Sequence, residues 1–164
     1  MKIKIQKTVP QAVVPFKHYP EDFCYDCVAT SCEEIAPNVY KYGLGIALQI
    51  DRNHQNPFAL SLTTEGSLLN RIYEAWQLSI DARPRSSVWK TGMVLSNCEG
   101  TIDELFRGEI SAVFYHVLPS MPRYKVGDRV VQIKLGFTLP MEFEQVDELD
   151  DTSRGTNGYG STGN

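Results

Sequence analysis

The chain has 164 residues, of which 42% are hydrophobic and 22% are charged, and its formal net charge is −4 at pH 7. This length and composition are those of one soluble domain with its own hydrophobic core. The negative charge argues against a surface that coats nucleic acid. No run approaches the ~18 apolar residues of a membrane span, and the first ten residues lack the apolar region of a secretion signal. We therefore expect a cytoplasmic protein that binds neither nucleic acid nor a membrane.

Short strand-like runs with turn signals between them fill most of the chain. Ile3 and Ile5 alternate with polar residues in an opening strand. The further predicted strands are Phe23–Ala29, Gly45–Ile50, Leu78–Ala82, Met93–Leu95, Ile110–Val117, Arg129–Leu135 and Met141–Val146. Many short strands without alternating helices predict an all-β protein, built as a closed barrel or as a sandwich.

One helix is predicted among these strands. Leu69, Ile72, Tyr73 and Trp76 fall at i, i+3, i+4 and i+7, which indicates an amphipathic helix over Ser67–Gln77. The simplest interpretation is that this apolar stripe packs on its own subunit. The alternative is a contact with a neighbouring subunit or a partner protein.

Cys24 and Cys27 form a Cys-x-x-Cys pair, a spacing that zinc and redox sites share. A zinc site needs four ligands, usually from two such pairs, and Cys32 and Cys98 do not make a second pair. The redox motif opens a helix, whereas Phe23–Val28 has the pattern of a strand. We therefore expect reduced, partly buried thiols.

The C-terminal stretch Arg154–Gly163 holds four glycines and several small hydroxyl residues, and it follows Glu142–Asp151, which carries six carboxylates in ten residues. Such a stretch cannot bury enough apolar surface to fold unaided. It is either a frayed terminus or a flap that orders on a ligand. As a flap, its amides would surround phosphates, Arg154 would bind phosphate oxygens, and Tyr159 would stack on a base.

The stretch Arg83–Ser87 carries groups that bind anions. Pro84 fixes the backbone, and Arg85 with the hydroxyls of Ser86 and Ser87 can face a common anion. The alternative is a simple polar turn.

The stretch Gly127–Ile133 is a candidate strand with a polar face. Period-two alternation predicts that Val130 and Gln132 share one side of it. Gln132 would then donate to a phosphate or simply lie on an exposed face.

In Asn97–Glu109, two apolar runs flank a turn bounded by glycines, which predicts a hairpin. Its main chain and the Asn97 amide, which both donates and accepts, can read the edge of a flat base. Asp103 can act as a general base toward a water molecule. The alternative for this aspartate is an ordinary turn former.

The order of these motifs resembles that of the trimeric dUTPase family. In chain order they are Tyr-Asp at 25–26, Pro-Arg-Ser-Ser at 84–87, Gly-Thr-Ile-Asp-x-x-Phe-Arg-Gly-Glu at 100–109, Gly-Asp-Arg-x-x-Gln at 127–132 and Arg-Gly-x-x-Gly-Tyr-Gly-Ser-Thr-Gly at 154–163. The resemblance covers residues 13 to 163, and its third and fifth motifs are the most specific.

This resemblance implies a distorted β-barrel of the jelly-roll type over residues 1–150, with an insert at 51–77, and a flexible flap over 151–164. It implies a homotrimer with shared active sites, closed by the flap of another subunit. The implied reaction is the hydrolysis of dUTP to dUMP and pyrophosphate, by attack of water on the α-phosphorus with Mg2+ present. That reaction limits uracil incorporation into DNA and supplies dUMP for thymidylate synthesis.

The resemblance also assigns roles to single residues. Asp103 matches the carboxylate that activates the water, and Phe106 matches a residue, usually Tyr, that packs under the deoxyribose. Asp26 matches a carboxylate that supports the metal through a water molecule. The other implied substrate contacts are the base-reading Asn97, Gly100 and Ile102, the phosphate-binding Arg85, Ser86, Ser87 and Gln132, and the flap residues Arg154, Tyr159, Gly160, Ser161 and Thr162.

Two other functions stay open from the sequence. dCTP deaminases resemble this chain in fold and share an Arg-Ser-Ser run like that at 85–87, but they lack the third and fifth motifs. A non-catalytic binding or signalling protein gated by a nucleotide is the second alternative, against which the intact Asp103 and the complete tail speak. The insert at 51–77 has no counterpart in the family pattern.

Overall fold

The structure is a computed structural model that describes residues 2–52 and 76–156. Its elements in chain order are β1 (Lys2–Lys7), β2 (Tyr25–Val28), β3 (Ser31–Ala36), β4 (Val39–Gly43), β5 (Ile46–Asp51), β6 (Gln77–Pro84), the 3-10 helix η1 (Ser86–Thr91), β7 (Met93–Leu95), β8 (Gly100–Asp103), β9 (Ser111–His116) and β10 (Arg129–Thr138). Within the described ranges, no helix is long and apolar enough to cross a membrane.

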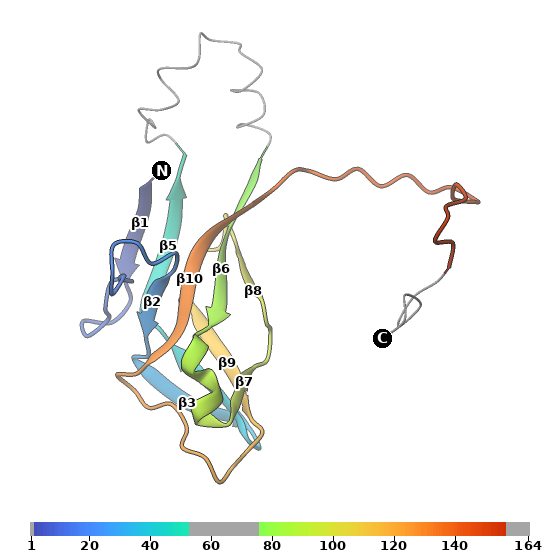
Figure 1. The fold of residues 1–164 in the computed structure, drawn as a ribbon. Helices are drawn as coiled ribbons and strands as arrows, with labels where there is room; N and C mark the ends of the chain where they lie inside the picture. The colour runs from blue at the N-terminus through green and yellow to red at the C-terminus, as the bar shows by residue number, and fades with distance from the viewer. Residues whose placement is uncertain (1, 53–75, 157–164) are drawn as a thin grey trace.

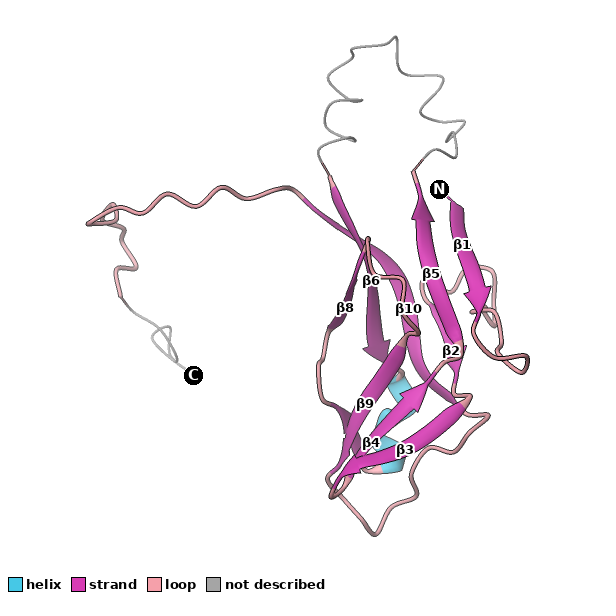
Figure 2. Cartoon of the chain, turned by 180° about the vertical axis from the view of Figure 1, so that it is seen from behind, coloured by secondary structure: helices cyan, strands magenta, loops and turns pink. Residues whose placement is uncertain are grey.

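Three antiparallel sheets surround one hydrophobic core (Figures 1 and 2). Two of them have four strands, in the orders β2-β10-β6-β8 and β3-β4-β9-β7, and the third is the pair β1-β5. Strands that are distant in sequence lie side by side, as β2 and β10 do. The all-β barrel of the jelly-roll type that was predicted is therefore confirmed.

An aromatic cluster lies at the centre of the core. Tyr42 and Phe114 have no exposed surface, and their rings meet edge to face at 5.8 Å between centroids. Tyr124 contacts both rings, and its carbonyl accepts a 2.9 Å hydrogen bond from the Tyr42 hydroxyl. Edge-to-face rings with a satisfied hydroxyl stabilise a core beyond the burial of their area.

The predicted strands are found except at the end of the chain. Met141–Val146 lies outside any strand and is exposed, so the strand predicted there is wrong. Its apolar residues alternate as in a strand, but no neighbouring strand of this chain receives them. The structure adds β3 and β4, which were not predicted.

The predicted helix over 67–77 lies outside the described residues except for its last two positions. Trp76 precedes β6 and Gln77 is the first residue of that strand. A helix that reaches Gln77 is therefore excluded, because Gln77 pairs with Thr138 of β10.

The alternation predicted for β10 is wrong at Val130. Val130 and Val131 are both completely buried, and the pairing with β2 shifts register between Arg129 and Val131. A bulge places one extra residue in a strand and changes which face the following residues occupy. Val130 therefore points into the core, while Gln132 points to the outer face.

The segment Asn97–Glu109 does not form a hairpin of its own. Its strand β8 pairs with β6, opposite Ile80 and Ala82, and β9 pairs instead with β7 and β4. Ile102 lies opposite Ile80 in this ladder, and both residues belong to or pack against the core. Pairing with a strand outside the segment thus decided the partner of β8, which the local pattern could not specify.

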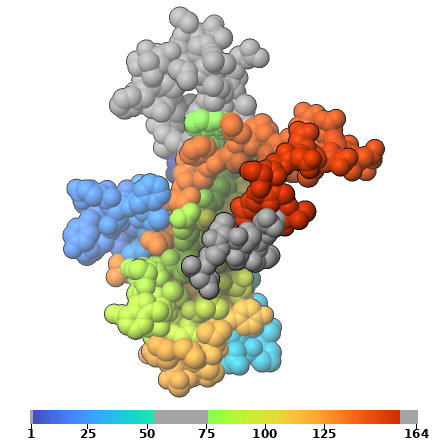
Figure 3. Space-filling view, turned by 45° about the vertical axis from the view of Figure 1, so that its right-hand side comes forward, coloured from blue at the N-terminus to red at the C-terminus, as the bar shows by residue number. Residues whose placement is uncertain are grey.

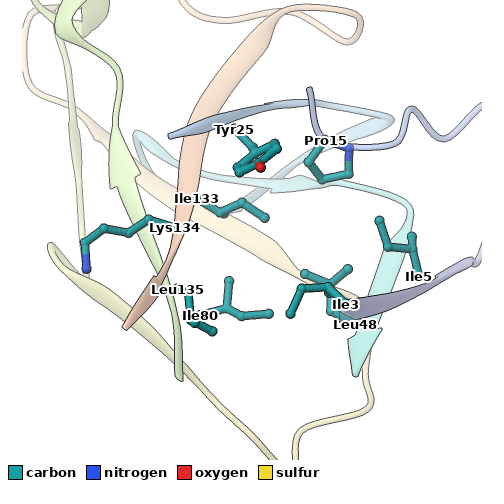
Figure 4. Close-up of a pocket in the computed structure, with 9 residues that line it drawn as sticks. All are labelled: Ile3, Ile5, Pro15, Tyr25, Leu48, Ile80, Ile133, Lys134 and Leu135. Carbon is teal, nitrogen blue, oxygen red and sulfur yellow. The ribbon is translucent and has the colours of Figure 1, made fainter. Parts of the chain in front are cut away.

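An apolar cavity of about 380 Å³ opens between the β1-β5 pair and the inner side of β10 and β6 (Figure 4). Ile3, Leu48, Ile80 and Ile133 line it, whereas the ammonium group of Lys134 points away from it. A cavity without charged groups is unsuited to phosphate, so the phosphate-binding site must lie elsewhere.

After Thr138 the chain leaves the barrel as an arm, residues 139–156, which contains no strand (Figures 1 and 3). Leu139, Met141 and Phe143 on this arm are 59%, 74% and 87% exposed. Exposed apolar side chains that gather on one segment are typical of surfaces that take part in protein contacts.

Candidate active site

A polar pocket of about 410 Å³ lies where β2 and β10 meet the end of β6. It is lined by His18, Tyr19, Asp22, Phe23, Cys24, Asp26, Arg85, Ser86, Arg129 and Gln132. Four of these residues were predicted to bind phosphate or metal: Asp26, Arg85, Ser86 and Gln132. The structure brings them together.

Two arginines flank one carboxylate in this pocket. Arg85 Nε donates to Asp26 Oδ1 at 2.7 Å, and Arg129 Nη1 donates to Asp26 Oδ2 at 2.9 Å. The three groups together carry a net positive charge, and the Asp26 side chain is only 13% exposed. Asp22 also lines the pocket and balances this charge, so the groups suited to a phosphorylated ligand are the two guanidiniums themselves, which bind phosphate oxygens by charge-assisted hydrogen bonds.

The backbone explains why these groups converge. Asp26 lies opposite Gln132 in the β2–β10 ladder, and Gln132 lies opposite Arg83 in the β10–β6 ladder. Gln132 Nε2 donates to the carbonyl of Pro84 at 3.0 Å, which ties β10 to the start of the Arg85 turn. Arg85 Nη1 donates to the Ser87 hydroxyl at 3.4 Å, and Ser87 lies beside the pocket rather than in its lining.

Arg129 was missed in the sequence, although it stands in the Gly-Asp-Arg-x-x-Gln motif. Strict alternation assigns it to the side opposite Gln132, and only the bulge at Val130 brings its guanidinium to Asp26. The two adjacent valines that follow it were the available signal, because two consecutive buried residues indicate a bulge.

The residues predicted to read the base, together with Asp103, lie at or next to the edge strand β8. Asn97, Gly100 and Ile102 line a small pocket of about 40 Å³, and Asp103 and Phe106 line a larger one of about 210 Å³. The two pockets share Ile102 and its neighbours Thr101 and Ser111, so they adjoin. A Cβ on Gly100 would lie 3.1 Å from Asn97 Nδ2, so glycine permits the close approach of Asn97.

The turn after Asp103 is held by its own hydrogen bonds. Phe106 N donates to the Asp103 carbonyl at 3.0 Å, and Arg107 Nη1 donates to the carbonyls of Glu104 and Phe106. The ring of Phe106 is 47% exposed beside Asp103. A carboxylate next to an apolar ring is an arrangement that can position a sugar and a water molecule.

The structure does not bring Asp103 to the arginine pocket of the same chain. Asp103 pairs with Ser79 on β6, whereas Gln132 pairs with Arg83, four residues further along that strand. Since β6 also separates β8 from β10, the backbone at Asp103 and the backbone at Gln132 are about 17 Å apart. One chain therefore presents two half-sites.

Of the flap residues predicted to bind the substrate, the structure describes only Arg154. Arg154 is exposed on the arm, after the last strand of the barrel. Tyr159, Gly160, Ser161 and Thr162 lie outside the described residues.

All four cysteines are free, as predicted. Cys27 is buried in the core, and burial raises its pKa to about 12, which leaves the thiol protonated and inert. Cys24 is partly buried, whereas Cys32 and Cys98 are exposed. Among the residues that the structure describes, no group of three His, Cys, Asp or Glu side chains could hold a metal ion.

The barrel and its half-sites, one rich in arginine and one with a carboxylate beside an aromatic ring, are those of a protein that binds a small phosphorylated ligand. The family model described as dUTPase matches residues 73–163. The chain is 31% identical to the deoxyuridine 5'-triphosphate nucleotidohydrolase of Clostridium novyi, over 99% of both chains. It is 34% identical to that of Corynebacterium glutamicum, over 98% of this chain and 94% of the relative. The chain belongs to the dUTPase family.

Solved structures agree with this assignment at the level of the fold. The dUTPase of Staphylococcus bacteriophage 80alpha with dUpNHpp superposes with a TM-score of 0.72 at 17% identity, over 99% of this chain and 98% of that one. The dUTPase from phage phi11 of S. aureus, described with a species-specific insert, superposes with a TM-score of 0.64 at 14% identity, over 93% of this chain and all of that one.

Proposed function

We propose that the chain is a dUTP diphosphatase, which hydrolyses dUTP to dUMP and pyrophosphate. The observation that carries this proposal is the similarity to dUTP nucleotidohydrolases along the whole chain. In the cell this reaction limits uracil incorporation into DNA and supplies dUMP for thymidylate synthesis, and we expect it to take place in the cytoplasm.

The arginine pocket is proposed to bind the triphosphate. Arg85 and Ser86 would hold phosphate oxygens, and Gln132 would reach the phosphate chain from β10. Asp26 fixes the guanidinium groups of Arg85 and Arg129 before the ligand arrives. Donors that are already oriented lose little conformational entropy on binding, which favours both affinity and alignment.

The pockets at β8 are proposed to bind the deoxynucleoside and to perform the proton transfer. Asn97 and the main chain at Gly100 and Ile102 would pair with the uracil edge, and the ring of Phe106 would exclude a 2′-hydroxyl. As water attacks the α-phosphorus, the Asp103 carboxylate accepts a proton from it. The bond from the α-phosphorus to the bridging oxygen breaks, and pyrophosphate leaves with its electron pair.

Magnesium is proposed to enter with the nucleotide. Both oxygens of Asp26 accept hydrogen bonds from arginines, so its carboxylate is suited to an indirect role, through water, rather than to direct ligation. A triphosphate supplies oxygen ligands itself, and Mg2+ keeps several waters in such sites. Bound there, Mg2+ would supply positive charge beside the phosphate oxygens, and Asp26 would hold one of its waters.

A homotrimer with shared active sites accounts for the separation of the half-sites. A gap of about 17 Å along the sheet is too wide for one α-phosphate to contact both Asp103 and Gln132 of a single chain. The exposed apolar residues of the arm, Leu139, Met141 and Phe143, require cover that this chain does not give them. Sedimentation equilibrium is expected to give three times the 18.5 kDa subunit mass; a monomer would exclude the shared site.

The flap would complete the site from another subunit. In this proposal Arg154 binds the γ-phosphate, Tyr159 stacks over the uracil, and Gly160, Ser161 and Thr162 surround the phosphates. Acidic residues between the barrel and the flap keep the connector solvated, since like charges repel one another.

The test of the function is the release of pyrophosphate from dUTP, dCTP, dTTP and UTP, each with Mg2+, while ammonia is followed in parallel. We expect pyrophosphate from dUTP alone, because the other bases or the ribose leave buried polar groups unpaired or clash. Ammonia from dCTP would indicate a deaminase of the same fold. Binding of dUTP without turnover would indicate a nucleotide-gated binding protein.

A further inference from the structure

Arg52 joins three segments that are distant in the sequence. It directly follows β5, and its side chain forms a two-pronged ion pair with Glu104, from Nε to Oε1 at 2.5 Å and from Nη2 to Oε2 at 2.6 Å. Its Nη2 also donates to the carbonyl of Trp76 at 2.8 Å. A guanidinium that contacts a carboxylate through two nitrogens fixes both the distance and the orientation of its partner.

Glu104 directly follows Asp103 in the chain, so the ion pair with Arg52 is formed next to the proposed catalytic carboxylate. Asp103 is the last residue of β8, which lies at the edge of its sheet and is paired only with β6. The chain leaves the ladder at Glu104, so no strand holds the turn that follows. Ends of edge strands open most easily, and a side-chain contact just beyond the end opposes that opening.

The contacts of Arg52 also extend, through Trp76, to the start of the arm. The Trp76 ring stacks on Phe137 with 4.7 Å between centroids and an angle of 16° between the planes. Phe137 is the last residue but one of β10, and the arm begins directly after this strand. The end of β5, the start of β6 and the end of β10 all lie at one end of the barrel (Figure 1).

We propose that Arg52 is a positioning residue for catalysis: through its ion pair with Glu104 it holds the Asp103 turn in the geometry that activates water. This inference rests on the proposed dUTP hydrolysis for its kinetic part. Arg52 does not touch the pockets that contain Asp103 or the arginines, so it acts through Glu104. The family resemblance does not account for this contact, since Arg52 stands in none of the five motifs.

The charge state of Glu104 agrees with a permanent contact. The hydrogen bond from Arg52 holds the pKa of Glu104 below its ordinary value, although burial alone would raise it. The pair is therefore ionised on both sides near neutral pH. Removing one partner leaves a half-buried charge without its counterpart, whereas removing both does not.

The experiment compares the full chain with Arg52→Gln, Glu104→Gln and the double variant. The control is Lys4→Gln, which removes the neighbouring ion pair of Lys4 with Asp51, at 3.2 Å, and changes the net charge by the same amount as Arg52→Gln. For each protein the assembly state, the kcat and KM for dUTP, and the hydrogen exchange of the peptide over residues 100–108 without nucleotide are measured.

We expect Arg52→Gln to lower kcat roughly tenfold, with KM changed by less than about threefold, because a misplaced base slows chemistry more than binding. Exchange of the Phe106 amide, which the turn protects, should be roughly tenfold faster. The double variant should be no worse than either single variant, and Lys4→Gln should behave as the parent protein.

The outcomes separate the two proposals. Unchanged exchange over 100–108 in Arg52→Gln overturns the positioning role, and so does faster exchange with unchanged kcat. A fall in kcat of the same size in Lys4→Gln also overturns it, since the effect would then be one of general stability. If the unaltered protein does not hydrolyse dUTP at all, the proposed function fails, whereas the exchange result still decides whether Arg52 holds the turn.

Discussion

Asp103→Asn is expected to bind dUTP and to hydrolyse it roughly 10²- to 10⁴-fold more slowly than the parent protein, the range that general base catalysis supplies. The amide that replaces the carboxylate has the same size and can still hydrogen-bond a water, but it cannot accept the proton. Asp103 already lies in the pocket beside Phe106, so the substitution requires no rearrangement of β8. The measurement is kcat by pyrophosphate release, together with calorimetric titration of a non-hydrolysable dUTP analogue.

Glu33→Gln is the matched control, because it removes one negative charge from an exposed position of β3, outside every pocket described above. It should leave kcat unchanged. Near-normal hydrolysis by Asp103→Asn would remove Asp103 as the base. A loss of analogue binding in the same variant would instead assign to Asp103 a role in binding.

Deletion of residues 154–164 is expected to leave the barrel folded and to lower kcat/KM by at least about 10³-fold. The last strand of the described chain ends at Thr138, so among the described residues the deletion removes none from a strand or from the core. What it removes is Arg154 and the proposed flap, and withdrawal of a charge-stabilising arginine from phosphoryl transfer costs 10³-fold or more. Circular dichroism and thermal unfolding test the fold, and kcat/KM for dUTP tests the site.

Mixing the two inactive proteins makes this test stricter. If Asp103 and the flap of one site come from different subunits, Asp103→Asn and the truncated chain should recover part of the activity when they are refolded together. A truncated protein with full activity would contradict the flap, and mixtures that stay inactive would contradict the shared site.

The sequence predicts most strands of this fold but misses the adjacent strands β3 and β4. In β5 and β9 the apolar residues face the core in a pattern that local sequence reveals. All six residues of β3 are exposed, and its Cys-Glu-Glu run carries no alternation that would mark a strand. What makes β3 a strand is its pairing with β4, a contact that only the folded chain supplies.

In the candidate site, too, local sequence predicts some features, and the pairing of separate strands decides the others. The motifs identify Arg85, Asp103 and Gln132 as candidates because the residue types and their order are visible in the chain. The bulge that brings Arg129 to Asp26 and the pairing of β8 with β6 both depend on contacts between strands that are separate in the sequence. The distance between the half-sites follows from strand order, which no short stretch of sequence contains.

With the shared site proposed above, that distance makes activity depend on concentration. A newly synthesised chain would carry every reactive group and yet be inactive until it assembles with other copies. On dilution below the dissociation constant of the assembly, the rate per chain should fall more steeply than substrate saturation explains. A cell that makes few copies of this protein would therefore have less activity than its chain count implies, and a defective copy would lower the output of the intact copies with which it assembles.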